Sequence, residues 1–207
     1  MDDYYIIKSP GEGEYTDRKS RFIGHAMPIS GEQEAIVIID QVKRKYWDAR
    51  HNCYAYITGD NGEITRCSDD GEPSGTAGRP ILDCLNNADL RNALIIVTRY
   101  FGGTLLGTGG LVRAYTQAAN AALNAAQIRH MQKGSLISIR GDYNSAEKIR
   151  RYLEQSDIII RDTTYTEEVE TVIAVTDRMI DSVLDSVTQV SSGRAMIQVL
   201  ENGYYDM

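Results

Sequence analysis

Apolar side chains in the first 133 residues recur at two spacings, every second residue or every third to fourth residue. The first spacing, or a compact β-branched run, predicts strands over residues 4–8, 22–28, 53–58, 64–67 and 93–98. The second spacing, with Ala-rich composition, predicts helices over residues 31–47, 76–86 and 111–127. These elements predict a mixed α/β domain with a mostly antiparallel sheet.

A second periodic pattern follows Gly134, which we take as the boundary between domains 1–133 and 134–207. It predicts strands over residues 136–143, 158–166, 168–175 and 195–200, and helices over 144–155 and 177–190. Asn144 and Asp177 are suitable N-caps for the two helices. The order βαββαβ predicts a ferredoxin-like domain, so the fold class is α+β with two domains.

Composition and charge patterning indicate which broad class of protein this is. The chain has 207 residues and 42% hydrophobic content, which is ordinary for a globular protein. It has no cationic, apolar N-terminal signal and no apolar run approaching 18 residues, so we expect a cytoplasmic protein without a membrane span. Three cysteines match neither a zinc site nor a Cys-x-x-Cys motif, in agreement with a reducing compartment.

The net charge of −7 is unevenly distributed. Residues 1–133 hold 15 Lys and Arg against 16 Asp and Glu, a balance of −1, whereas residues 134–207 hold 7 against 13, a balance of −6. The C-terminal domain is therefore a poor candidate for binding a phosphate backbone and suits a protein partner better. Basic clusters at 18–21 and 43–45 leave the N-terminal domain able to present a local basic patch.

Residues 99–115 read as the end of a strand, a glycine-rich loop and the start of a helix. A helix N-terminus has unpaired N–H groups, and glycines let an anion approach the backbone, so the loop is suited to a phosphate or carboxylate. Arg99 and Arg113 bracket it and could bind the anion. The segment lacks the phosphate-loop motif, and Val112 breaks the dinucleotide motif. The alternative is that the glycines only permit a tight turn and close packing.

Residues 66–80 hold three carboxylates close together, Asp69, Asp70 and Glu72. They could hold a hard cation such as magnesium, accept protons or bind a basic partner, and the alternative is a solvated acidic turn. Ser74 and Thr76 could serve as a nucleophile, although no Gly-x-Ser-x-Gly motif is present. Both segments flank the strand at 93–98, so we expect one cleft. Its lining is predicted to be Asp69, Asp70, Glu72, Arg99 and Arg113.

His51 and Cys53 lie two residues apart and could share one face of a strand, as a thiol–imidazole pair would need. No acidic group is placed to orient the histidine, and cysteine is commonly a small core residue. The favoured interpretation is that His51 is a hydrogen-bonded residue of the cleft.

Four motifs give the chain a recognisable identity. They lie at residues 20–24, 49–55, 68–78 and 99–115, and their order resembles the IMPACT family, close to its bacterial YigZ branch. The resemblance implies an N-terminal domain similar to elongation factor G domain IV, RNase PH and the GHMP kinases. It implies a C-terminal domain similar to elongation factor G domains III and V. Some family members have a lysine where this chain has Leu105.

The resemblance also implies a function, because eukaryotic IMPACT proteins act in translational control. We expect a cytoplasmic, non-enzymatic regulator of translation that binds RNA, the ribosome or a translation-related protein, without a cofactor. Residues expected to bind RNA or another anion are Arg21, His51, Ser74, Thr76, Arg99, Tyr100, Gly102, Gly103, Thr108, Gly109, Gly110 and Arg113. One alternative is a phosphotransferase or hydrolase that binds a nucleotide and magnesium through the two segments. Another is an adaptor that binds a protein through its acidic C-terminal domain.

Overall fold

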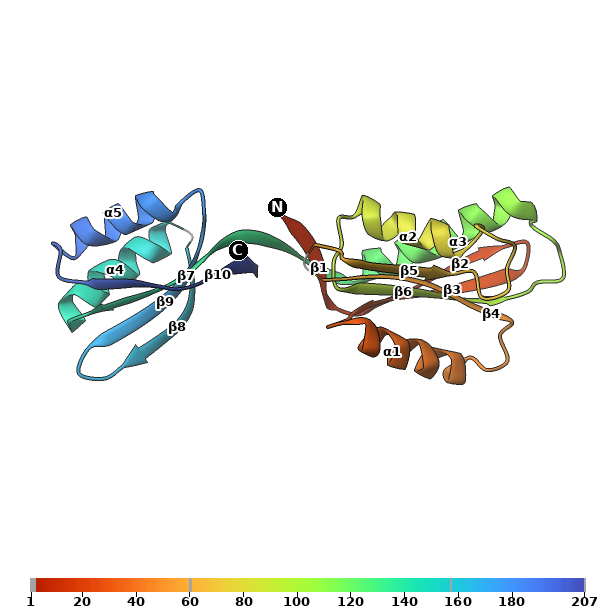
Figure 1. The fold of residues 1–207 in the computed structure, drawn as a ribbon, viewed down its shortest axis with the longest axis horizontal. Helices are drawn as coiled ribbons and strands as arrows, with labels where there is room; N and C mark the ends of the chain where they lie inside the picture. The colour runs from red at the N-terminus through yellow and green to blue at the C-terminus, as the bar shows by residue number, and fades with distance from the viewer. Residues whose placement is uncertain (1–2, 60, 157, 207) are drawn as a thin grey trace. The chain divides into compact units, whose positions relative to one another are not determined.

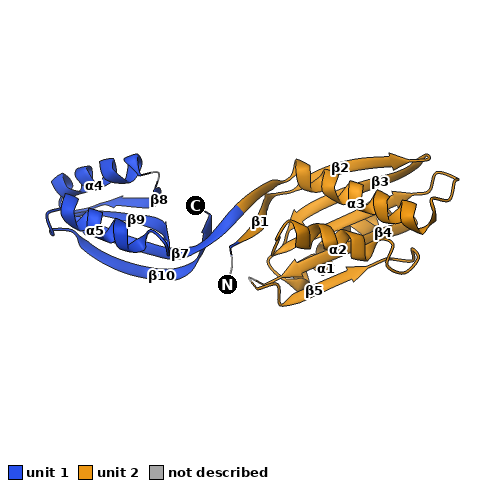
Figure 2. Ribbon diagram, turned by 90° about the horizontal axis from the view of Figure 1, so that it is seen from above, with its two compact units in different colours: residues 1–3, 130–207 blue, residues 4–129 orange. Residues whose placement is uncertain are grey.

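The computed structural model describes residues 3–59, 61–156 and 158–206 and divides the chain into two compact units (Figures 1 and 2). The first unit along the chain comprises residues 4–129 and is orange and labelled unit 2 in Figure 2. The second comprises residues 130–206 together with Asp3 and is blue and labelled unit 1 there. The division falls four residues before the boundary expected at Gly134. Gly134 is not a linker residue, because it lies inside strand β7 (Gln127–Gly141) and pairs with Thr176 and Gly203.

The first unit is built on a five-stranded antiparallel sheet. Its strands, in spatial order, are β2 (Gly11–Asp17), β3 (Ser20–Pro28), β6 (Ala93–Tyr100), β4 (His51–Thr58) and β5 (Ile64–Ser68). Helix α1 (Glu32–Lys45) covers one face, and α2 (Gly78–Asn87) and α3 (Gly107–Ala125) cover the other (Figure 1). Strand β1 (Tyr4–Ser9) precedes the sheet and forms a parallel bridge from Tyr5 to Leu90.

The central strand β6 explains why residues 93–98 form a continuous apolar run. Ile95 and Val97 belong to the core beneath α2 and α3, whereas Leu94 and Ile96 belong to the core beneath α1. Successive side chains of a strand point to opposite faces, so a strand covered on both faces needs apolar residues at every position.

Strand β2 was not predicted. It lies between the strands predicted at 4–8 and 22–28, and it pairs with β3. A Cβ on Gly13 would lie 2.4 Å from the Ala121 carbonyl carbon, so this strand needs glycine where α3 crosses it.

Helix α3 begins at Gly107, four residues before the predicted start at Leu111. Thr108, Gly109 and Gly110 are therefore part of its first turn and not of a preceding loop. Glycine is a poor helix former, but tertiary packing outweighs local propensity here. The packed residues include Leu111, Ala114, Tyr115, Ala118 and Ala122.

The second unit has the predicted element order. It runs β7, α4 (Tyr143–Gln155), β8 (Ile159–Tyr165), β9 (Val169–Thr176), α5 (Ile180–Val190) and β10 (Met196–Asp206). The strands are antiparallel in the order β10, β7, β9, β8, and both helices cover one face (Figure 1). The likeness to ferredoxin-like and translation-factor domains stays a prediction.

The predicted N-caps of both helices are wrong. Asp142, and not Asn144, caps α4, because its carboxylate accepts the Ser145 N–H at 2.7 Å. Helix α5 begins after Met179 without a side-chain cap, and Asp177 instead pairs with Lys133 at 3.2 Å. Among the described helices, none is long and apolar enough to cross a membrane.

Candidate functional site

A cavity of about 460 Å³ lies in the first unit where β6 ends and β4 begins. Residues 66–80, here called the acidic segment, form one wall. The loop after β6 forms another wall together with the first turn of α3. Its walls are mostly apolar, with a few polar groups between them. The lining residues are Arg50, His51, Glu72, Pro73, Arg99, Phe101, Leu105, Leu106, Gly107, Thr108 and Leu111. Apolar walls with a few convergent polar groups are typical of a ligand site.

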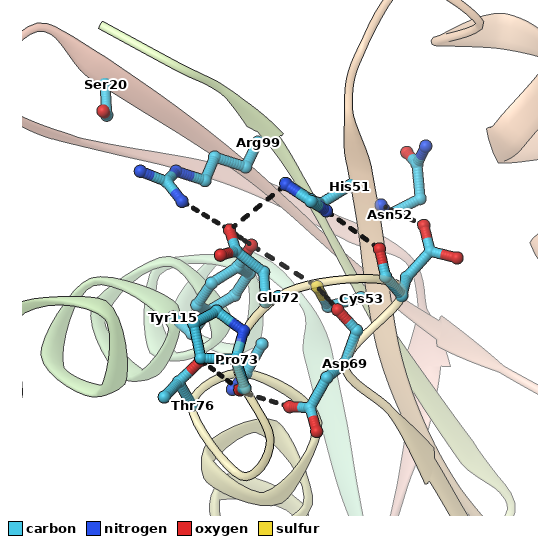
Figure 3. Close-up of polar contacts among 12 residues, drawn as sticks. Ser20, His51, Asn52, Cys53, Asp69, Glu72, Pro73, Thr76, Arg99 and Tyr115 are labelled. Carbon is cyan, nitrogen blue, oxygen red and sulfur yellow. Dashed lines mark hydrogen bonds and ion pairs between the residues drawn. The ribbon is translucent and has the colours of Figure 1, made fainter. Parts of the chain in front are cut away.

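Arg99 is the central cation of this site, and it is buried. Its Nη1 donates to the Glu72 Oε1 at 2.5 Å (Figure 3). The guanidinium carbon lies 5.4 Å from the ring centre of Phe22 and 5.6 Å from that of Phe101, so two aromatic rings hold the charged group. The Nε of Arg99 is buried and has no hydrogen-bond partner in the described part of the chain.

Glu72 is the counter-ion of Arg99, and its Oε1 also accepts the Tyr115 hydroxyl at 2.8 Å. Burial raises the pKa of Tyr115, and the neighbouring Cys53 and Glu72 raise it further. The hydroxyl therefore stays protonated and donates. A buried carboxylate that receives an arginine and a tyrosine is held in one position.

His51 is oriented by the backbone of the acidic segment. Its Nδ1 lies 2.8 Å from the Asp70 carbonyl oxygen, and a carbonyl only accepts, so Nδ1 carries the proton. Its Nε2 lies 3.9 Å from the Glu72 Oε1 (Figure 3). When the imidazole is neutral, Nε2 is an acceptor in this lining residue.

The surroundings of Cys53 disfavour a nucleophilic pair with His51. Burial raises the pKa of its thiol to about 12, although the hydrogen bond to Tyr115 acts in the opposite direction. The thiol donates to the Asp69 carbonyl oxygen at 2.9 Å and lies 3.4 Å from the Tyr115 hydroxyl. Only a thiolate is a good nucleophile, so this buried, protonated thiol is a core residue.

The three carboxylates of the acidic segment face three different sets of partners. Asp69 accepts the backbone N–H groups of residues 75, 77 and 78 at 2.8–3.0 Å. Asp70 binds the Lys43 ammonium and the Asn52 N–H, each at 2.7 Å. Only Glu72 lines the cavity. A shared magnesium site is therefore not formed by these carboxylates, and the described residues hold no group of three or more His, Cys, Asp or Glu suited to a metal ion.

Three of the other predicted residues line the cavity, and four lie in the adjoining loop and helix turn. His51, Arg99 and Thr108 line the cavity together with Glu72. Gly102 and Gly103 lie in the loop beside it, where the Gly102 N–H donates to the Ser20 hydroxyl at 3.1 Å. Gly109 and Gly110 follow in the first turn of α3, outside the lining.

Five predicted residues are not among those that line the cavity. Arg113, expected to share the cleft with Arg99, is exposed on α3. Arg21 pairs with Glu14 at 2.7 Å, and the Tyr100 hydroxyl donates to Asp48 at 2.8 Å. Ser74 is exposed, and the buried Thr76 hydroxyl donates to the carbonyl within its own turn at 2.7 Å, so neither is placed as a nucleophile.

Sequence reasoning missed Phe22, Tyr115 and the apolar wall formed by Phe101, Leu105 and Leu106. Tyr115 had a usable signal, because it follows Leu111 by four residues and must share its helix face. The apolar wall had none, because the loop after β6 has no periodicity from which to infer its direction.

Comparisons with known proteins agree with the motifs. The Impact N-terminal domain family matches residues 18–123, and a domain of unknown function, DUF1949, matches residues 139–194. IMPACT family member YvyE of Bacillus subtilis is 36% identical over 100% of this chain and 95% of its own length. IMPACT family member YigZ of Escherichia coli is 34% identical over 80% of this chain and 82% of its own length. A solved structure described as a hypothetical protein is 30% identical, covers 97% of this chain and 98% of its own, and has a TM-score of 0.61.

Proposed function

Because this chain belongs to the IMPACT family, we propose that it is a regulator of translation that binds a translation-related protein through the cavity of its first unit. The observation that carries the proposal is the apolar wall beside the buried ion pair. Leu105, at 80% exposure, is the most exposed residue of that wall. An exposed apolar side chain next to a cavity is a feature of protein-binding surfaces.

The charges of the cavity favour a protein over RNA as its occupant. An RNA backbone is bound by several accessible cations, and the affinity then depends steeply on salt. Arg99 is buried and paired with Glu72, and Arg21 and Arg113 lie outside the lining. Arg50 is then the one exposed arginine of the lining, so the cavity offers an RNA backbone few free charges.

The proposal is tested with the full chain in a cell-free translation system. We expect the purified protein to change the rate of protein synthesis, and Leu105→Asp to abolish that effect because a charge replaces an apolar contact. Val37→Asp is the matched control, since Val37 is an exposed apolar residue of α1 on the other face of the sheet. An effect that survives Leu105→Asp, or no effect of the native protein, would contradict the proposal.

Sedimentation with ribosomes distinguishes a protein partner from RNA. Association that is lost in high salt and after ribonuclease treatment would identify RNA, through a surface other than this cavity. Magnesium-dependent nucleotide turnover would instead favour the enzyme. For a protein partner we expect association that resists moderate salt and fails with Leu105→Asp.

A further inference from the structure

We propose that the cavity binds the C-terminal residue of a polypeptide, with an apolar side chain on the walls and the terminal carboxylate on Arg99. The inference rests on the proposed function in taking the occupant to be a protein segment. Three independent features of the cavity carry it, namely the free edge of a guanidinium, the apolar walls and the acceptor nitrogen of a histidine.

The first feature is the unused side of Arg99. Its Nη1 is taken by Glu72, whereas its Nε is buried without a partner and no described residue accepts from Nη2. The Nε–Nη2 edge of a guanidinium binds a carboxylate side-on through two parallel hydrogen bonds. A buried donor without a partner is rare, and a ligand carboxylate would satisfy it.

The charges of the cavity are compatible with an incoming anion. Two cationic side chains, Arg50 and Arg99, line it against one carboxylate, Glu72. The first turn of α3 contributes Gly107 and Thr108 to the lining, and N–H groups at a helix N-terminus favour negative charge. The lining therefore carries one more positive than negative side chain, so Glu72 alone does not exclude a carboxylate.

The second feature is the apolar wall, which a bare inorganic anion would leave unfilled. Phe101, Leu106 and Leu111 line the cavity, whose volume of about 460 Å³ exceeds that of a carboxylate alone. An aliphatic or aromatic side chain attached to the carboxylate gains affinity by burying its surface there.

The third feature is the His51 Nε2. Because Nδ1 donates to the Asp70 carbonyl, the neutral ring presents Nε2 as an acceptor, and the nearby Glu72 is an acceptor as well. Two neighbouring acceptors are best matched by a hydrogen-bond donor on the ligand. The amide N–H of a C-terminal residue supplies that donor beside the carboxylate and the side chain.

The test uses the full chain labelled with ¹⁵N and the probe N-acetyl-leucine, which carries all three groups. We expect titration to shift the Nε–Hε signal of Arg99, identified by its absence in Arg99→Lys. N-acetyl-leucinamide lacks the charge and should bind about 10- to 100-fold more weakly, which is the effect of one lost charge-assisted contact. Acetyl-Leu-Asp-amide, whose carboxylate is on a side chain, and inorganic phosphate should also bind more weakly than the acid.

A charge series at the exposed Leu105 keeps the test valid if changes at the buried Arg99 unfold the protein. Leu105→Asp should weaken binding of the acid, and Leu105→Lys should maintain or strengthen it, with Val37→Asp as the unchanged control. Equal affinities for acid and amide, or no Arg99 shift at the solubility limit of the acid, would overturn the inference. Tighter binding of the aspartate peptide would assign the site to a side-chain carboxylate and overturn the C-terminal assignment.

The two proposals can fail separately. Selective binding of the acid without an effect on translation would leave the carboxylate site standing and remove the proposed function. An effect on translation that depends on Leu105, together with equal binding of acid and amide, would support the proposed function and remove the carboxylate site.

Discussion

Asp69 stabilises the acidic segment through its backbone contacts. Its carboxylate accepts three backbone N–H groups, from Gly75, Ala77 and Gly78. Burial works against its charge, but the three donors together hold the pKa of Asp69 below the ordinary 3.8. The carboxylate thereby fixes the turn that carries Glu72 to the cavity, so a residue outside the lining determines its geometry.

We predict that Asp69→Asn lowers the free energy of unfolding at pH 7 by about 1–3 kcal/mol, since an amide cannot accept on both of its terminal atoms. The folded pKa is lowered, so the contribution of the carboxylate is complete above the unfolded value. It is lost as the pH falls below about 4 through the folded pKa. The difference between native protein and variant in urea unfolding should therefore be constant from pH 7 to about 5 and shrink below it.

Asp83→Asn is the control for this prediction. Asp83 pairs with Arg79 at 2.9 Å on the surface of α2, and surface pairs contribute less than about 1 kcal/mol. If Asp69→Asn lowers the free energy of unfolding no more than Asp83→Asn does, water replaces the carboxylate in the turn.

At the scale of elements, the packing of α3 on the sheet determines where the cavity lies. The backbones of β3 and α3 approach so closely that a Cβ on Gly24 would lie 2.3 Å from the Ala118 carbonyl oxygen. The same helix carries Leu111 to the cavity wall and Tyr115 to Glu72. A shift of α3 away from the sheet would therefore disturb the cavity.

We predict that Gly24→Ala lowers the free energy of unfolding by about 2–3 kcal/mol, because the added methyl group meets backbone that cannot turn aside. Gly109→Ala is the matched control in the first turn of α3. A Cβ there meets nothing within 4 Å, and alanine is the better helix former, so stability should be unchanged or rise by up to about 1 kcal/mol. Urea unfolding of the two variants measures the difference, and equal effects would contradict the close approach of β3 and α3.

At the scale of the whole molecule, strand β7 belongs to both units. Its residues Met131, Gln132 and Lys133 pair with the end of β10, and the Lys133 carbonyl also accepts the Asp177 N–H at 3.1 Å. A division at the expected boundary would remove these pairings from the second unit, whereas a division at the observed one would keep them.

We predict that a fragment of residues 130–207 unfolds cooperatively and is more stable than a fragment of residues 134–207 by about 1–3 kcal/mol, because three strand pairs are lost in the shorter one. Thermal and urea unfolding followed by circular dichroism compare them. Equal stability would mean that the end of β10 contributes nothing to the second unit, and failure of both fragments to fold would mean that the unit depends on the rest of the chain.

The sequence by itself determined the type and order of most elements and the family. Periodicity is a local property, so the run at 93–98 predicts a buried strand whatever lies above it, and the motifs give family membership without coordinates. It also singled out Glu72 and Arg99, because charged residues beside glycine-rich segments are chemically unusual, and His51, because of its spacing to Cys53.

Only the tertiary structure decided the roles of equivalent residues. Asp69, Asp70 and Glu72 are alike in sequence, yet backbone N–H groups, a lysine and a buried arginine define three different environments. The same holds for the glycines, which local propensity assigns to turns. In β2 close packing against α3 requires glycine, whereas the first turn of α3 only tolerates it. The hydrogen-bond partner of a side chain, and its burial, depend on contacts between residues that are distant in the chain. No local sequence pattern contains these contacts.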